Sequence, residues 1–336
     1  MTLVVPFYNS AETLGRCREA IGALSPAPDR VLLVDDCSTD RSLEIARASG
    51  YEVIRNERNQ GRGGAKLAAL RHVHGDLAVL VDSDVICPSA TLEPILRRFG
   101  EDPELSCLSA VPSPHSPFTD FSSRFKAVYM YQVLRASKGT TDFSHGCLQA
   151  VRLRDLEGLP GAFNRNFRPD DIHLGMTLSR AGKRLFLTDE LQPVHERHYS
   201  FSELVKKDFI IPREFMRMML HHRQTRQSLK QGRFAHASMA QVAAIGLTAL
   251  AAIFLAAGRA EVRWAGAGLC LVLAFVLRYG FIRECRRQYG LRFAVQAALF
   301  SWCDHLIMAA GMVCGFFWAV SGYKRRSLRE DLSLGL

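Results

Sequence analysis

The sequence lacks the two glycine-rich signatures that mark the commonest nucleotide-binding folds. No G-x-G-x-x-G follows its first apolar run, and no G-x-x-x-x-G-K-[ST] occurs in the chain. These patterns bring backbone N–H groups against phosphates in dinucleotide-binding domains and in P-loop ATPases. We therefore expect neither of those two classes.

Cysteine pairing is also missing. The nine cysteines are scattered, and none stands in a C-x-x-C pair. Structural zinc sites and disulfide frameworks both need clustered or regularly spaced cysteines. We therefore expect a reduced, cytosolic setting for residues 1–199. The N-terminal segment has no basic region ahead of a long apolar core, so we also expect no cleaved signal peptide.

Acidic residues are scarce in the C-terminal part of the chain. Residues 200–336 contain 8 Asp/Glu and 19 Lys/Arg, whereas residues 1–199 contain 25 and 24, so the net charge of +10 lies in the C-terminal part. Its basic residues flank apolar segments instead of forming a stripe on a folded domain. This pattern favours anionic lipid headgroups as partners and argues against nucleic acid.

Three long apolar segments predict a transmembrane region over 237–320. Residues 237–257 contain no charge, and this length suffices to cross about 30 Å of hydrocarbon. Residues 264–282 and 295–320 are the second and third segments. The third contains Asp304 and His305, which are either functional groups or a hydrogen-bonded pair that holds the helices together. It crosses once or folds back near these residues, and we favour three crossings in total.

Basic residues predict the orientation of these segments. Lys and Arg precede the first segment and follow the second, so both places and residues 1–199 are expected in the cytosol. A third crossing then puts the basic tail, 321–336, outside, against that rule. Residues 200–236 mix basic and bulky apolar side chains, which predicts one or two amphipathic helices at the bilayer surface, bent near Pro212. We therefore predict a multi-pass protein of the cell (inner) membrane with a cytoplasmic N-terminal domain.

Residues 1–199 alternate between strand-like and helix-like patterns. Short apolar runs, typical of strands buried on both faces, precede amphipathic stretches of helix length. This order predicts an α/β domain with a mostly parallel, Rossmann-like sheet and helices on both faces. The expected strands are 3–5, 31–34, 51–54, 77–81 and 105–111, and the expected helices are about 10–24, 40–48, 62–73 and 89–99.

The apolar run at 77–81 leads into Asp82-Ser83-Asp84. Alternate residues of an extended chain point the same way, so two carboxylates here repel each other unless a cation lies between them. Oxygen ligands without thiolates suit Mg²⁺ or Mn²⁺. A solvated turn with Asp84 as a helix cap is the ordinary alternative.

Polar residues follow the other predicted strands as well. Ligands of parallel sheets bind beyond the carboxyl ends of the strands, so these residues predict one site along a single rim. Helix capping or an ordinary turn explains each of them taken alone. The rim residues are Pro6, Tyr8 and Asn9 after the first strand, Asp36 after the second, Asn59, Gly61 and Arg62 after the third, and Asp82 and Asp84 after the fourth.

Four segments, in this order and spacing, resemble family 2 glycosyltransferases with a GT-A fold: VVPFYNSAETL, LLVDDCSTDRS, NERNQGRGGAKLAAL and VLVDSDV. FSHGCLQAVRLRDL and FRPDDIHLGMTLSRAGKRL are similar to that family's acceptor-side segments. The resemblance covers about residues 1–200. Members with C-terminal membrane spans usually build polysaccharides or glycolipids on the cytosolic face, and this layout resembles the bacterial exopolysaccharide enzymes among them.

The resemblance implies a nucleotide-sugar donor, with a UDP-sugar as the default. Asp36 would accept hydrogen bonds from the base, Asp82 would lie near the ribose and the metal, and Asp84 would ligate Mg²⁺ or Mn²⁺. Arg62 and Lys66 would add positive charge at the diphosphate, although a solvated helix face explains them equally well. The implied donor-binding residues are Pro6, Tyr8, Asn9, Asp36, Asn59, Gly61, Arg62, Lys66, Asp82 and Ser83.

Glycosyl transfer also needs a base for the acceptor hydroxyl. Asp171, which follows Pro169 and Asp170, matches the family's catalytic carboxylate, and Asp170 stands where Glu is more common. Adjacent carboxylates can raise the pKa of one of them, which suits a base. Helix capping by Asp170 is compatible with this role. In-line attack by the hydroxyl would invert the anomeric centre, as in the family.

Two more places carry weaker signals. His195 matches a position where some relatives set a histidine against the metal or phosphate, although a lone histidine is more often structural. Gly146 and Cys147 match the acceptor-side turn, but His145 replaces its first glycine. Processive synthases of the family carry Q-x-x-R-W before a membrane span. Its absence here predicts that one sugar is added per binding event.

Three functions stay open at this point. The first is a membrane-bound, inverting, metal-dependent glycosyltransferase that acts on a lipid-linked or polysaccharide acceptor. The second has polyprenyl phosphate itself as the acceptor. The third, from another class, is a nucleotide-sensing membrane scaffold or transporter without turnover. The set Asp82, Asp84 and Asp171 argues against the third, because a sensor needs no catalytic base.

Overall fold

The computed structural model describes residues 1–157, 159, 170–222, 233–234, 237–257 and 260–321. Most of the predicted basic tail, Pro169 and part of the predicted amphipathic segment lie outside the described residues. The chain divides into two compact units. Among the described residues, the first unit comprises Met1–Ser113 and Lys138–Arg197, and the second comprises Pro114–Ser137 and the residues from His198 onward.

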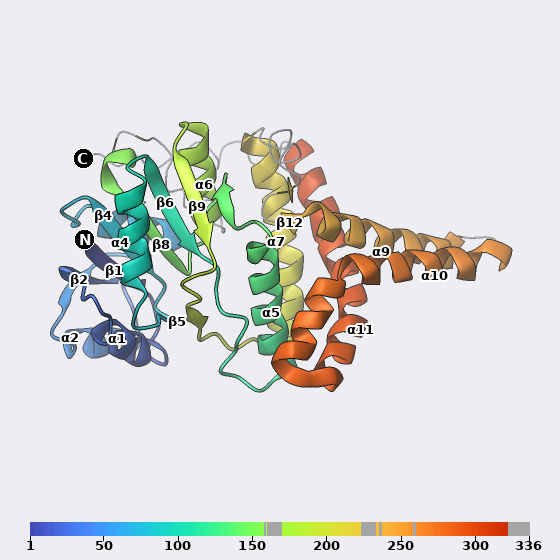
Figure 1. The fold of residues 1–336 in the computed structure, drawn as a ribbon, viewed down its shortest axis with the longest axis horizontal. Coiled ribbons are helices and arrows are strands. Elements are labelled where there is room, and N and C mark those ends of the chain that lie inside the picture. Colours follow the sequence, from blue (N-terminus) through green and yellow to red (C-terminus); the bar gives the residue numbers. More distant parts are fainter. Residues whose placement is uncertain (158, 160–169, 223–232, 235–236, 258–259, 322–336) are drawn as a thin grey trace. The chain divides into compact units, whose positions relative to one another are not determined.

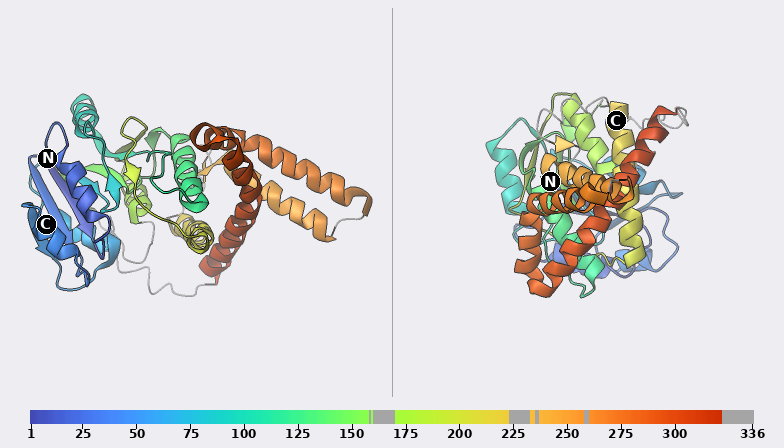
Figure 2. Two further views of the ribbon diagram at one scale, coloured as in Figure 1. Left: turned by 90° about the horizontal axis from the view of Figure 1, so that it is seen from below. Right: turned by 90° about the vertical axis from the view of Figure 1, so that its right-hand side faces the viewer.

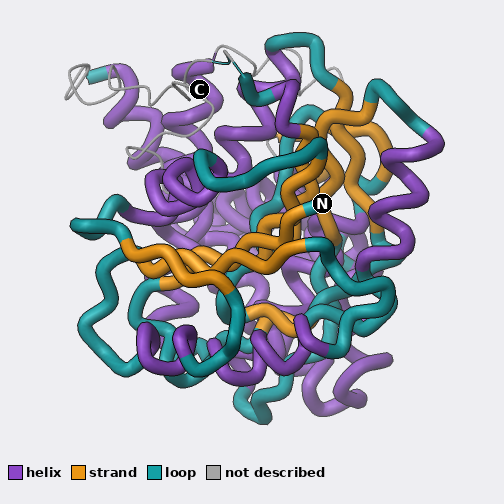
Figure 3. The backbone as a smooth tube through the Cα atoms, turned by 90° about the vertical axis from the view of Figure 1, so that its left-hand side faces the viewer, coloured by secondary structure: helices purple, strands orange, loops and turns teal. Residues whose placement is uncertain are grey.

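The first unit is built on an eight-stranded sheet with the order β3-β2-β1-β4-β8-β6-β9-β7 (Figures 1 and 3). Strands β3, β2, β1 and β4 are parallel neighbours, and so are β6 and β9. The predicted α/β class with a mostly parallel sheet is confirmed. The strands are β1 Thr2–Phe7, β2 Arg30–Asp35, β3 Glu52–Arg55, β4 Leu77–Val81, β6 Leu105–Ala110, β7 Gly139–Thr141, β8 Leu148–Arg152 and β9 Arg184–Thr188.

Helices cover both faces of this sheet. Successive side chains of a strand point to opposite faces, so one buried strand serves two cores. In β1, Leu3 and Val5 pack in the cluster that contains α1, α2 and α4, whereas Val4 packs with α3 and α6. The helices are α1 Leu14–Gly22, α2 Ser42–Arg47, α3 Gly61–Leu70, α4 Leu92–Glu101 and α6 Asp170–Arg180.

Antiparallel strands bring later segments to the rim formed by the carboxyl ends of the parallel strands. Strand β8 lies between β4 and β6 and is antiparallel to both, with Leu148 opposite Val81. The start of β8 therefore lies where β4 ends, and the Asp82 N–H donates to the carbonyl of Cys147 at 3.2 Å. A second pair, β5 Val85–Ile86 with β10 Val194–His195, sets His195 opposite Val85.

The second unit is mainly helical. Helices α9 and α10 pack against each other, with Ala251 of α9 and Ala267 of α10 in one apolar cluster (Figure 2). By length and composition, α9 and α11 can each cross a membrane, whereas the apolar part of α10, Val262–Leu277, is shorter. The helices are α5 Phe121–Arg135, α7 Phe201–His222, α9 Met239–Ala257, α10 Ala260–Leu277 and α11 Tyr279–Val320, and a short ribbon pairs β11 Arg233–Phe234 with β12 Ala237–Ser238.

One prediction for this unit needs correction, and two alternatives that the sequence left open are decided. The second apolar segment does not continue to 282: α10 ends at Leu277, and Phe281 of α11 packs edge-on against Phe125 with ring centroids 5.4 Å apart. No hairpin forms near Asp304, because α11 stays helical from Leu291 onward and its one non-helical residue is Gly290 (φ 85°). The segment from Phe201 to His222 is a single helix that contains Pro212.

Close backbone packing joins α7 to α11. A Cβ on Gly311 would lie 2.3 Å from the carbonyl oxygen of Phe209, and a Cβ on Gly315 would lie 2.3 Å from that of Arg213. Glycines four residues apart let two helices approach in this way. Buried His305, with Nδ1 3.0 Å from Thr248 Oγ1, joins α11 to α9. These contacts favour the helix-holding interpretation of His305.

Candidate active site

Hydrogen bonds join the loops after β1, β2 and β4 into one polar edge. The side-chain carbonyl of Asn9 accepts from the Thr39 N–H at 2.9 Å, and the Asn9 N–H donates to Ser38 Oγ at 3.0 Å. Asn9 itself has φ 48°, a left-handed conformation that Asn tolerates better than most residues. Ser10 Oγ lies 2.8 Å from Ser83 Oγ. The loops that were predicted to share a rim therefore contact one another.

Asp36 lies buried at the end of β2 and holds the loop before α3. Its carboxylate accepts from Asn56 Nδ2 at 2.8 Å and from the Gln60 N–H at 2.9 Å. Gly61 then starts α3 with φ 71°, and its N–H donates to Asn59 Oδ1 at 3.0 Å. In this structure the carboxylate expected to contact the nucleotide base fixes the loop that carries Arg62.

Pro6 and Tyr8 belong to the end of β1 and the loop that follows it. Pro6 pairs with Val34 of β2, whereas the pairing of β1 with β4 stops at Val4. Proline is tolerated where a strand loses a neighbour in this way. Tyr8, at 47% exposed, presents an aromatic ring to solvent beside these loops.

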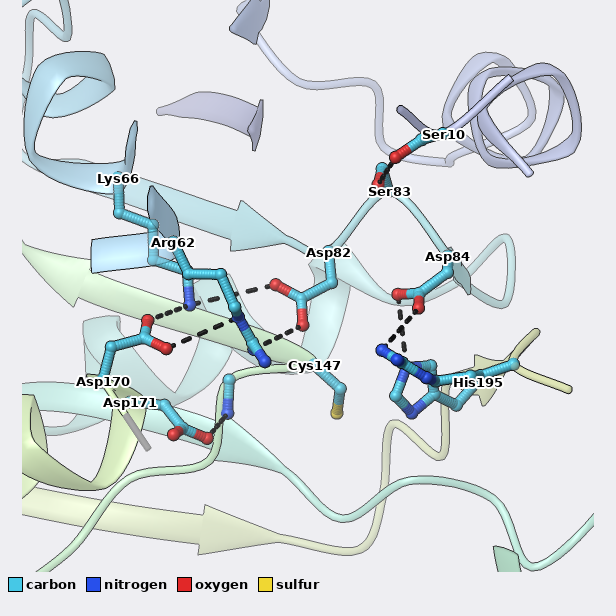
Figure 4. Close-up of polar contacts among 12 residues, drawn as sticks. Ser10, Arg62, Lys66, Asp82, Ser83, Asp84, Cys147, Asp170, Asp171 and His195 are labelled. Atoms are coloured by element: carbon cyan, nitrogen blue, oxygen red, sulfur yellow. Dashed lines mark hydrogen bonds and ion pairs between the residues drawn. The ribbon is translucent and has the colours of Figure 1, made fainter. Parts of the chain in front are cut away.

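The Asp82-Ser83-Asp84 segment is a turn, not an extension of the strand. Strand β4 ends at Val81, and the Val85 N–H donates to the carbonyl of Asp82 at 3.1 Å. In Figure 4 the carboxylate of Asp82 lies by Arg62 and Lys66, and that of Asp84 lies by His195. The prediction assumed extended chain and was wrong in this detail. Each carboxylate has its own basic partner, which relieves the expected repulsion.

Asp82 belongs to a charged cluster with Arg62, Lys66 and Asp170 (Figure 4). Lys66 Nζ lies 3.0 Å from Asp170 and 3.8 Å from Asp82. Arg62 reaches Asp82 at 3.4 Å and Asp170 at 3.5 Å. The side chains of Lys66 and Asp170 are 3% and 2% exposed, whereas Arg62 is 59% exposed. The cluster thus extends from the core to solvent.

The surroundings shift the pKa values of this cluster in opposite directions. Burial raises the pKa of Asp82, and Lys66 and Arg62 offset this only in part. Burial also opposes ionisation of Asp170, but Lys66 and Arg62 outweigh it and lower the pKa of that carboxyl. The expectation that the adjacent carboxylates raise a pKa therefore does not apply to Asp170, because two cations face it.

Asp171 is held beside the cluster by backbone groups. Its Oδ2 accepts from the Gly146 N–H at 2.7 Å, and Ser144 Oγ donates to its carbonyl at 2.6 Å. A Cβ on Gly146 would lie 2.9 Å from Asp171 Cβ, and one on Gly175 would lie 2.1 Å from the Ser144 nitrogen. Both glycines therefore allow the segment before β8 to approach the start of α6.

Asp84 faces His195, with 3.2 Å between the carboxylate and Nε2, and Arg197 lies 3.9 Å away. Burial opposes the charge of both groups, but Asp84 raises the pKa of His195, and His195 lowers the pKa of Asp84. Among the described residues, no three His, Cys, Asp or Glu side chains gather into a metal-binding group. One oxygen and one imidazole nitrogen still fit Mn²⁺ or Mg²⁺ that takes its other ligands from phosphate and water.

The sequence reasoning missed two residues of this site. Burial lowers the pKa of His145 to about 4, which leaves a neutral imidazole within the electrostatic reach of Asp171 and His195. Its Nδ1 has no hydrogen-bond partner among the described residues. Arg197 is the second. From the sequence, His145 is identified only as the residue that replaces a glycine, and Arg197 lies two residues after His195 in a segment where only His195 was singled out.

A solved structure shares this fold. The mannosyltransferase PcManGT from Pyrobaculum calidifontis, in complex with GDP-Man and Mn²⁺, aligns with 95% of this chain and 86% of its own at TM-score 0.56 and 18% identity. The first unit is therefore a GT-A-like domain, and long apolar helices follow it. Residues 2–159 match the family described as Glycosyl transferase family 2, so this part of the chain is a family 2 glycosyltransferase domain.

Curated relatives match shorter stretches. An undecaprenyl-phosphate 4-deoxy-4-formamido-L-arabinose transferase from Yersinia enterocolitica is 26% identical over 169 residues, 47% of this chain and 50% of its own. The succinoglycan biosynthesis protein ExoO from Rhizobium meliloti is 36% identical over 87 residues, 25% of each chain. The chain thus spans about half of the first relative and a quarter of the second.

Proposed function

We propose that the protein is a membrane-bound, inverting glycosyltransferase that moves a sugar from a nucleotide-diphosphate donor to a lipid-linked saccharide. One observation carries the proposal. Asp171, held by the Gly146 N–H, lies next to a cluster with two cations at the rim of a family 2 domain. In this proposal Asp171 serves as the base for an acceptor hydroxyl, and the two cations supply positive charge for a leaving diphosphate.

Asp171 is the proposed base. The hydrogen bond from Gly146 occupies Oδ2 and fixes the plane of the carboxylate. The second oxygen then takes the proton of the acceptor hydroxyl as that hydroxyl attacks the anomeric carbon and the bond to the diphosphate breaks on the opposite side. Asp170 pairs with Lys66 and so positions the helix start that carries Asp171.

Donor binding is assigned to the rim loops. Arg62 is the most accessible cation of the cluster and is proposed to turn from its carboxylate partners toward the diphosphate. The loops with Pro6, Tyr8, Asn9 and Asp36 would surround the nucleoside. Ser83 and Asn59 would lie at the border of this nucleoside site. A UDP-sugar is the default donor. Gly146 and Cys147 are proposed to border the acceptor.

Asp84 and His195, with Asp82 nearby, are the residues that would hold Mg²⁺ or Mn²⁺. A divalent ion bound there would neutralise charge on the diphosphate leaving group. Until it binds, Arg197 and His195 balance the charge of Asp84. The Mn²⁺ in the mannosyltransferase that shares the fold supports this assignment.

The helical part supports a place in the cell (inner) membrane with the catalytic domain cytoplasmic. Large apolar side chains stand exposed on α9, α10 and α11, among them Ile253, Leu269 and Phe317 at 61%, 61% and 65%. Exposed apolar surface of this kind is typical of regions that contact a membrane or another protein, and the length of α9 and α11 favours the membrane. We keep the division into a catalytic domain (1–199), interfacial helices (200–236), a transmembrane region (237–320) and a basic tail (321–336).

Polyprenyl phosphate is the second candidate acceptor. The Yersinia relative, named as an undecaprenyl-phosphate sugar transferase, favours it. Assays in membranes with a polyprenyl phosphate or with a polyprenyl-linked saccharide separate the two acceptors. Transfer of a single sugar in either case fits the absence of Q-x-x-R-W.

The decisive experiment measures release of nucleoside diphosphate in membranes, in the presence of Mn²⁺, over a screen of nucleotide-sugar donors. We expect D171N to lose about 10²–10⁴-fold in rate, which is the usual contribution of a general base, while donor affinity and thermal stability stay close to those of the wild type. A wild-type protein that binds donor without turnover would support the sensor or scaffold hypothesis and reject the proposal.

A further inference from the structure

A cavity of about 380 Å³ opens in the second unit, between the start of α5 and the bend in α11. Its polar lining includes Arg124, Arg292 and Gln296, and its aromatic lining includes Tyr289 and Phe293. The volume falls within the range of about 300–1,000 Å³ found for small-molecule sites. None of these residues takes part in the site on the sheet rim.

The two arginines bring uncompensated positive charge into this cavity. In the part of the chain that the structure describes, neither Arg124 nor Arg292 forms an ion pair with a carboxylate. Arg124 is nevertheless fixed: its Nε donates to the carbonyl of Phe118 at 3.1 Å, and its guanidinium lies over the Tyr289 ring at 4.7 Å. Its terminal nitrogens remain available to an anion.

The aromatic residues that line the cavity are also held by contacts with their neighbours. The Tyr289 hydroxyl accepts from the Ser116 N–H at 2.8 Å, and the Tyr289 ring lies 5.0 Å from that of Phe293. Phe293 in turn packs against Phe121 at 5.5 Å. Rigid aromatic walls around two guanidinium groups suit a ligand with a phosphate at one end and a hydrocarbon chain at the other.

The sequence around Arg292 favours a position of the cavity at the level of the lipid headgroups. Arg283, Arg286 and Arg287 precede the bend at Gly290, whereas Asp304 and His305 are the only Asp, Glu, His, Lys or Arg residues between Arg292 and Val320. The side chains of Leu291 and Val295, beside the cavity, are 63% and 51% exposed. A helix with a basic segment before an apolar one meets the bilayer surface at the change between them.

We propose that this cavity binds the phosphate of the polyprenyl carrier that holds the acceptor saccharide, with Arg124 and Arg292 as its ligands. Arginine pairs with phosphate through two parallel hydrogen bonds, and the apolar surface beside Leu291 would receive the prenyl chain. The proposal rests on the proposed function, since it names the part of the acceptor lipid that anchors it. The headgroup of an anionic phospholipid has the same chemistry and is the competing source.

The experiment uses the full chain in phosphatidylcholine nanodiscs and a fluorescent farnesyl diphosphate as the probe. R124Q/R292Q should weaken probe binding about tenfold or more, as expected when charge-assisted hydrogen bonds are lost. The matched control is R283Q/R286Q, which removes the same charge from exposed positions outside the cavity and should change binding little. Unlabelled farnesyl diphosphate should compete with the probe, and added phosphatidylglycerol should not.

Two outcomes would overturn the proposal. Equal weakening in both double variants would show that only the surface charge of the segment matters, and competition by phosphatidylglycerol would assign the cavity to a bulk phospholipid. The binding assay needs no turnover, so it separates this proposal from the proposed function. Probe binding that depends on the arginines but is unaltered in D171N supports the cavity, whether or not diphosphate release is observed.

Discussion

The two units each contain a buried lysine–aspartate pair, and the pairs differ in what surrounds them. In the first unit, Lys66 and Asp170 are 3% and 2% exposed; in the second, Lys126 and Asp208 are 6% and 2% exposed. Lys66 contacts Asp82, which in turn pairs with the exposed Arg62, so the first pair is connected to solvent. Lys126 instead lies 4.9 Å from the centre of the Tyr129 ring, among packed helices. Buried charge alone therefore does not distinguish the proposed reaction centre from a structural pair, whereas its connection to accessible groups does.

The strongest test of this comparison removes each lysine. K66M and K126M should each lower the free energy of unfolding by about 3–5 kcal/mol, because either change leaves a buried carboxylate without its buried lysine partner. Chemical denaturation of the full chain in detergent measures both. K66M should also abolish diphosphate release, whereas K126M should retain it in proportion to the folded fraction.

Double variants sharpen the distinction. Replacing both partners of a buried pair by apolar residues is often neutral for stability. We expect K66M/D170L and K126M/D208L both to regain stability over the single variants. Only K126M/D208L should be active. Activity in K66M/D170L would remove the first cluster from the proposed mechanism.

The second unit depends on backbone packing as well as on charge. G311A puts a Cβ 2.3 Å from the carbonyl oxygen of Phe209, so α7 and α11 must separate. We expect a loss of about 1–3 kcal/mol, typical of overpacking, seen as a lower melting temperature in detergent. G268A on α10, where a Cβ meets nothing within 4 Å, is the matched control and should not destabilise.

A similar glycine-to-alanine substitution in the first unit should lower its activity more than its stability. G146A brings a Cβ to 2.9 Å from Asp171 Cβ and so displaces the proposed base. We expect kcat for diphosphate release to fall about tenfold, equivalent to about 1.4 kcal/mol. G15A, in α1, meets no atom within 4 Å and serves as the control. An unchanged kcat in G146A would argue that the position of Asp171 does not limit the reaction.

The smallest effect concerns acid stability. The pKa of Asp170 is lowered from 3.8, so its contribution to stability is present above that value and is lost as the pH falls through the folded-state pKa. Between the two values, unfolding free energy should fall by at most about 1.4 kcal/mol per pH unit. Denaturation over the acid range should show this slope in the wild type and in the surface control E93Q, but a shallower one in D170N.

The first unit was the more predictable of the two in its fold. Buried β1, β2 and β4 are short apolar runs between polar turns, so periodicity identified them. The position of β8 was not predicted, since nothing in LQAVR tells whether it is parallel or antiparallel to β4. In the helical unit, apolar composition gave the long segments but not the break at Gly290, which depends on one backbone conformation.

The site was predicted by residue type better than by geometry. Polar residues after parallel strands must share an edge, so the contacts of Asn9, Asp36 and Ser83 were accessible from the strand pattern. The partners of Asp82 and Asp84 were not, because they come from α3, α6 and β10, which only the tertiary fold brings near. His145 carried no signal except its place beside Gly146. The catalytic and ligand roles of these residues stay predictions.

The hydrogen bond between Asp82 and Cys147 has a consequence for engineering. Because β8 begins where β4 ends, the segment proposed to border the acceptor is hydrogen-bonded to the segment proposed to bind the donor. Under the proposed function, a foreign loop grafted before β8 to change the acceptor would also disturb the proposed donor site. Donor and acceptor specificity would then have to be altered together.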